Sequence, residues 1–109
     1  MPSNNSPLSM EGLREVLDRA LAAERGLKLV FKEGTAEQNS AAATHQRARM
    51  HKLRAEDRRR SYEIYPADHP QRGQSPWDIL FISKKPMLDG SCELHVIKSS
   101  LANFTYEEL

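Results

Sequence analysis

The sequence predicts an α+β fold in the order α-β-α-β-β, with a small three-stranded sheet and two helices packed on one of its faces. Two observations support this prediction. Residues 9–26 and 35–60 carry helix-start signals and apolar residues at helical spacing. Residues 27–32, 79–82 and 92–98 are short apolar or alternating runs, which is typical of strands.

The length of 109 residues is that of one domain, so we expect residues 1–8 to form a disordered tail and residues 9–109 a single α+β domain. The single cysteine, Cys92, excludes an internal disulfide and suits a reducing compartment. No apolar stretch reaches the roughly 20 residues of a membrane span, and the first residues do not resemble a signal peptide. We therefore expect a cytoplasmic protein.

The first helix is predicted to begin at Ser9, a favourable N-cap residue, and to end at Gly26. Its buried stripe should consist of Leu13, Val16, Leu17, Ala20 and Leu21. Arg14 and Asp18 are four residues apart, so we expect them to form an ion pair on the outer surface.

The second helix is predicted to begin with a capping box between Thr35 and Gln38. Small residues dominate its packing face, which includes Met50 and Leu53 as the larger apolar side chains. After Leu53 this face has no large apolar residue, so residues 56–60 should project into solvent.

A proline-rich connection spans residues 62–78, and its length makes it a candidate functional segment. The continuous apolar run at 79–82 predicts a central strand covered on both faces, and if residues 27–32 pair with it in parallel, the intervening helix is a right-handed crossover. In that arrangement Val30, Ile97 and one side of 79–82 would form an apolar patch, available to a partner or to a second copy of the chain.

The most informative feature is a basic run at residues 45–60, which holds seven of the sixteen Lys and Arg residues and two of the four His. Residues 35–60 carry a balance of +4, whereas the rest of the chain carries −3. On a helix, Arg47, His51, Arg54 and Arg58 form one ridge, and Lys52, Arg59 and Arg60 lie on the outer surface or at the helix end. Arginine suits phosphate because its planar fork donates two parallel hydrogen bonds.

Three interpretations of this ridge remain open at the sequence level: contact with nucleic acid, contact with a protein, and a solvated helix face. Trp77 adds an aromatic side chain that stacks on a base or on an arginine of the helix or, alternatively, anchors the long loop to the core. Asp78 is expected to cap the turn at residues 74–78 or to pair with an arginine of the helix.

Catalytic and metal-binding signatures are absent from the sequence. Cys92 and His95 are spaced like a metal pair, but residues three apart on a strand point to opposite faces. The chain has no nucleophile elbow, Walker loop or zinc-protease motif. We therefore expect a non-enzymatic protein without a cofactor or a metal.

The order of a short strand, the segment QRARMHKLR and the segment GQSPWDILFIS resembles small uncharacterised proteins encoded by tailed phages and prophages. The resemblance covers residues 27–83. Ser75, Pro76, Trp77 and Asp78 carry its sharpest part, followed by Arg47 and Arg49. It implies a phage accessory protein in the host cytoplasm, of a kind that binds nucleic acid or host machinery, or that blocks defence systems such as CRISPR complexes.

The leading hypothesis is therefore a small binding protein that places Arg47, Arg54 and Arg58 against nucleic-acid phosphates, with Trp77 nearby. The alternative is an anti-CRISPR-like inhibitor that docks on a host protein or nucleoprotein complex through the same helix. Both hypotheses allow a homodimer, and neither involves a membrane.

Overall fold

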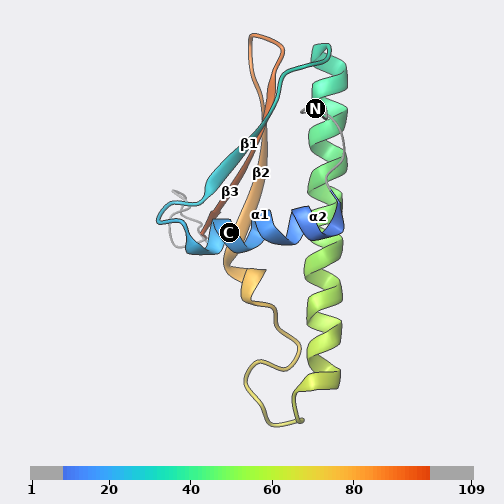
Figure 1. The fold of residues 1–109 in the computed structure, drawn as a ribbon, viewed down its shortest axis with the longest axis vertical. Coiled ribbons are helices and arrows are strands. Elements are labelled where there is room, and N and C mark those ends of the chain that lie inside the picture. Colours follow the sequence, from blue (N-terminus) through green and yellow to red (C-terminus); the bar gives the residue numbers. More distant parts are fainter. Residues whose placement is uncertain (1–8, 99–109) are drawn as a thin grey trace, which may run out of the picture.

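The computed structural model describes residues 9–98, which fold in the predicted order α-β-α-β-β. The elements are α1 (Met10–Ala22), β1 (Leu27–Phe31), α2 (Ala36–Ile64), the short 3-10 helix η1 (Pro76–Ile79), β2 (Leu80–Pro86) and β3 (Cys92–Lys98) (Figure 1). Two helices and an antiparallel sheet make the fold α+β, as predicted. The tail expected at 1–8 and the segment 99–109 lie outside the described residues.

Helix α1 begins as predicted, because the Ser9 Oγ accepts a hydrogen bond of 3.0 Å from the backbone N–H of Gly12. The predicted end at Gly26 is wrong, since the helix ends at Ala22. Gly26 instead serves the sheet. It has a φ of +97°, and a Cβ there would collide with the carbonyl oxygen of Val96, so glycine allows the chain entering β1 to approach β3.

Helix α2 begins with the predicted capping box, in which Thr35 and Gln38 exchange hydrogen bonds of 3.0 and 3.1 Å. Its 29 residues make it about 43 Å long. The sheet lies beside its N-terminal half, and α1 crosses it near the middle (Figure 1). Neither helix of the described chain combines the length and apolar character of a membrane span.

The sheet has the order β1-β3-β2, and both pairings are antiparallel. The prediction that residues 79–82 form a central strand parallel to 27–32 is therefore wrong, because β3 separates the two strands. Val96 of β3 faces Leu27 on one side and Ile82 on the other. The apolar run does not reflect burial on both faces, since Phe81 is 47% exposed and Ile79 is 49% exposed.

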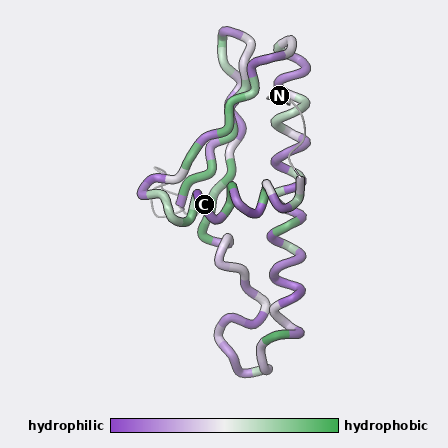
Figure 2. The backbone as a smooth tube through the Cα atoms, viewed as in Figure 1, coloured by the Kyte–Doolittle hydropathy of each residue, from purple (hydrophilic) through white to green (hydrophobic). Residues whose placement is uncertain are grey.

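Both helices pack on one face of the sheet, as predicted. The main core cluster consists of Leu13, Leu17, Ala20, Met50, Leu53, Trp77, Leu80, Ile82 and Val96. Within residues 9–98 no helix covers the opposite face, where Val30 is 37% exposed and Ile97 is half-buried. The strands are the most hydrophobic part of the chain, whereas the C-terminal half of α2 is largely hydrophilic (Figure 2).

Candidate binding surface on helix α2

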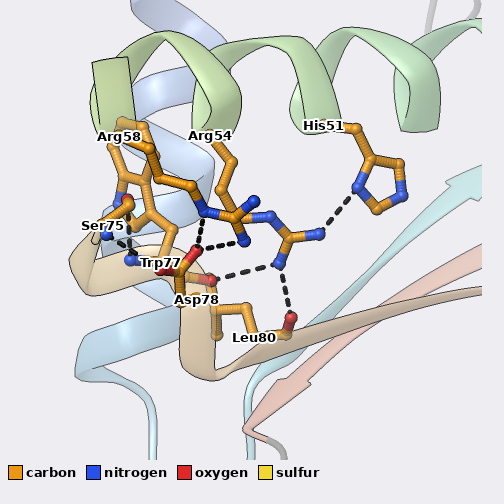
Figure 3. Close-up of polar contacts among 7 residues, drawn as sticks. All are labelled: His51, Arg54, Arg58, Ser75, Trp77, Asp78 and Leu80. Atoms are coloured by element: carbon orange, nitrogen blue, oxygen red, sulfur yellow. Dashed lines mark hydrogen bonds and ion pairs between the residues drawn. The ribbon is translucent and has the colours of Figure 1, made fainter. Parts of the chain in front are cut away.

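The predicted ridge on α2 is divided into side chains that hold the fold together and side chains that face solvent. His51, Arg54 and Arg58 extend from α2 toward η1 and the start of β2 (Figure 3). Arg47, one turn before His51, is exposed. The position of η1 beside the helix causes this division.

Arg54 joins α2 to the start of β2. Its Nη1 donates to the carbonyl oxygens of Trp77 and Leu80, at 3.3 and 2.9 Å, and its Nη2 lies 2.7 Å from Nδ1 of His51 (Figure 3). Burial lowers the pKa of Arg54, and the charge of Arg58 lowers it further. The guanidinium of Arg54 already donates hydrogen bonds to backbone carbonyls, so Arg54 has a structural role. It contributes positive charge to the ridge, but its donors are engaged within the fold.

His51 accepts the hydrogen bond from Arg54, which requires an unprotonated Nδ1. Partial burial lowers the pKa of His51, and the charges of Arg54, Arg47 and Arg58 lower it further. The imidazole is therefore neutral at pH 7, so the ridge carries three positive charges at that pH and not four.

Arg58 and Asp78 form the second connection between α2 and η1. The Asp78 Oδ1 lies 2.7 Å from Nε and 2.5 Å from Nη2 of Arg58, and the Oδ2 accepts a bond of 2.9 Å from the N–H of Ser75 (Figure 3). Both predicted roles of Asp78 are thus confirmed. Burial alone would raise the pKa of Asp78, but the bonds from Arg58 and Ser75 lower it below its usual range.

Trp77 lies in the core, with only 5% of its surface exposed. Its Nε1 donates to Asp18 at 2.9 Å, and the guanidinium carbon of Arg14 lies 5.6 Å from the ring centroid. The predicted pair of Arg14 with Asp18 is replaced by these contacts. The anchoring alternative for Trp77 is confirmed, whereas stacking on a base is wrong for a ring that is buried in this way.

The exposed side chains of the basic run form a surface, which we call the basic face and which includes Arg58 and His51. Its cations are Arg47, Lys52, Arg58, Arg59 and Arg60, with His45 and His51 exposed among them. Two small residues, Ala48 and Ala55, are exposed between the cations. The only acidic residues of the segment 44–60 are Glu56 and Asp57, and both are partly buried.

The loop that follows α2 folds back against the last turns of the helix. Ser61 is buried, and its Oγ accepts a bond of 2.6 Å from the N–H of Gly73 and donates to the carbonyl of Arg58. Arg72 lies 5.2 Å from the ring centroid of Tyr62. The prediction that residues 56–60 project into solvent is therefore only partly right, because this loop covers one side of them.

A cavity of about 470 Å³ lies where the loop, η1 and the last turns of α2 meet. Its lining includes Asp57, Ser61, Ile64, Tyr65, Pro76 and Ile79. Sequence reasoning missed this cavity, and the length of the proline-rich loop was the only signal that pointed to this region.

Cys92 and His95 lie on opposite faces of the sheet. Cys92 is buried under α2, whereas His95 is on the other face and lies 2.8 Å from a carboxylate oxygen of Glu93. Among residues 9–98, no three His, Cys, Asp or Glu side chains are grouped so that they could hold a metal ion.

Comparison with protein-family models, with curated proteins and with solved structures finds no match to this chain.

Proposed function

We propose that the chain is a small non-enzymatic protein whose basic face binds the phosphate backbone of nucleic acid. The observation that supports this most strongly is the concentration of five exposed Lys and Arg residues on one stretch of α2. A net charge of only +1 for the whole chain favours a local contact over the coating of long nucleic acid.

The form of the basic face suits a phosphate backbone. The side chains of Ala48 and Ala55, in the middle of the surface, are single methyl groups that do not extend far from the helix. A nucleic-acid strand could therefore approach the helix closely while cations on both sides reach its phosphates. Among residues 9–98, the side chains of Arg47, Lys52 and Arg60 make no hydrogen bond or ion pair, whereas Arg59 lies 3.2 Å from Glu63 in an exposed pair that contributes little. Arg54 and Trp77 do not belong to this surface, because Arg54 binds backbone carbonyls and Trp77 is buried.

The test is a fluorescence anisotropy titration of a 20-base-pair duplex and a 20-nucleotide single strand between about 50 and 300 mM salt. Four phosphate contacts predict a slope of log K against log salt of about −3 to −4. Replacing Arg47 and Arg59 by Gln should weaken binding at least tenfold at low salt and reduce the slope by about 2.

The matched control replaces Lys32 and Lys85 by Gln, which removes the same charge from exposed positions outside α2. This control should bind as the wild type does. Absence of binding at 50 mM salt, or equal losses in the two double variants, would contradict the proposal.

The second candidate is an inhibitor that docks on a host protein or nucleoprotein complex, as phage anti-defence proteins do. Tyr62 and Ile64 favour it, because they are 56% and 63% exposed and lie next to Arg59 and Arg60. Exposed aromatic and arginine side chains are enriched among the residues that dominate protein interfaces. Inhibition of a purified CRISPR complex that survives 300 mM salt and is lost in Arg59→Glu would favour this candidate.

A further inference from the structure

The cavity at the C-terminal end of α2 adjoins the basic face. Asp78, which lines the cavity, is the residue that binds Arg58 of the basic face. A volume of about 470 Å³ falls within the range of about 300–1,000 Å³ that small-molecule sites occupy. A nucleic-acid strand on the basic face would therefore lie close to the cavity.

The walls of the cavity combine apolar surfaces with polar groups. Ile64, Pro76 and Ile79 provide apolar surface, and Tyr65, whose ring stacks on His69 with centroids 4.3 Å apart, provides an aromatic side chain. Gln71 and Gln74 also line the cavity. This combination suits a flat ligand with apolar faces and a polar edge, which is the form of a nucleobase.

Two carboxylates line the cavity, and they differ in what they bind. Asp78 is occupied by Arg58 and by the N–H of Ser75. Asp57 is partly buried and makes no side-chain hydrogen bond or ion pair with any residue from 9 to 98. A carboxylate only accepts hydrogen bonds, so a ligand that uses Asp57 has to supply N–H donors.

We propose that the cavity binds one unpaired base of a strand that docks on the basic face, and that Asp57 selects guanine. The Watson–Crick edge of guanine presents two adjacent N–H donors, N1–H and the N2 amino group, which match the two oxygens of a carboxylate. Adenine and cytosine offer one amino group beside an acceptor, and thymine offers one imino group. The exposed cations of the basic face, which meets the cavity at the pair of Arg58 and Asp78, favour a ligand that carries phosphate.

This inference rests on the proposed function, and its test separates the two. Twelve-nucleotide oligothymidylate strands that carry dG, inosine, dA, dC or dT at the centre are titrated against the full chain by anisotropy. The strand with dG should bind about tenfold more tightly than the all-thymidine strand, since a good two-bond contact discriminates by about that factor. Inosine lacks the N2 amino group and should lose most of this gain.

Asp57→Asn keeps the size of the side chain and removes one of its two acceptors. We expect it to reduce the preference for dG, measured as the ratio of the affinities of the same variant for the dG strand and the all-thymidine strand, to less than twofold. Asp68→Asn is the matched control, because it makes the same change at an exposed position outside the cavity lining and should keep the preference.

The outcomes are distinct. If all five strands bind equally well, the base-binding proposal is overturned while the proposed function stands. A dG preference that persists in Asp57→Asn overturns the role of Asp57. If no strand binds at 50 mM salt, the proposed function fails and this inference fails with it.

Discussion

The two halves of α2 are held in the fold by different forces. Residues 36–53 pack against the sheet and α1 through buried apolar side chains, among them Ala43, Met50 and Leu53. Residues 54–64 have only one buried side chain, Ser61, and are joined to η1 and the loop by hydrogen bonds and an ion pair. The first half is held mainly by apolar burial, with buried Asn39 bonded to the carbonyls of Gly34 and Gly90, whereas the second depends on polar partners supplied by residues 72–80.

Arg47 and Arg54 show what this difference means for function. They lie on the same flank of α2, seven residues apart, and the sequence gives no reason to separate them. Arg54 faces η1 and binds two backbone carbonyls, whereas Arg47 is exposed. Which arginines can bind a partner is therefore decided by the element that packs beside each of them.

The largest expected effect comes from Trp77, because η1 attaches to the core through it. Trp77→Ala should lower the free energy of unfolding by about 3–5 kcal/mol, as measured by urea denaturation, since it removes a buried ring from the main cluster. Asp18→Asn keeps the ring and alters only its hydrogen bond, so it should cost about 1 kcal/mol. A loss below 1 kcal/mol in Trp77→Ala would show that η1 is held in another way.

The next prediction compares Arg54→Met with Arg47→Met. Arg54→Met leaves the carbonyls of Trp77 and Leu80 without their guanidinium donor, and we expect a loss of about 1–3 kcal/mol in the free energy of unfolding. Arg47→Met should change stability by less than about 0.5 kcal/mol but weaken nucleic-acid binding severalfold. Equal stability losses in the two variants would contradict the division of the ridge.

Local features of this fold could be predicted from the sequence. The caps at Ser9 and Thr35 and the turn at Asp78 depend on contacts between residues three apart, so their residue types are sufficient to identify them. The stripe through Leu13 and Leu17 follows in the same way from the helical period.

Features that depend on long-range pairing could not be predicted in this way. The run 79–82 is apolar on both sides of the strand, but its place in the sheet is set by pairing with β3, which makes β2 an edge strand. The bonds of Arg54 span 23 and 26 residues, and the bond from Trp77 to Asp18 spans 59. The cavity beside Asp57 likewise exists only because the loop returns to the helix.

The smallest predicted effect is a dependence on pH at His51, where the structural and binding roles of the ridge meet. Burial and the neighbouring arginines lower the pKa of His51 in the folded chain, while the unfolded chain keeps a value of about 6.5. As the pH falls from about 7.5 to about 5.5, the unfolded state therefore binds more protons, and stability decreases. Protonation also removes the acceptor for Arg54.

Nucleic-acid binding should respond to the same protonation in the opposite direction, because a charged His51 adds a cation next to Arg47 and Arg58, where phosphate would lie. Over this pH interval, we expect the melting temperature to fall and the affinity to rise. His51→Gln keeps an acceptor for Arg54 but does not titrate. The difference between wild type and variant therefore reports the pH dependence that His51 causes, without that of the other histidines. The wild-type minus variant difference is plotted against pH once for the melting temperature and once for the affinity. If both differences are independent of pH, or if both change in the same direction, His51 does not link the structural part of α2 to its basic face.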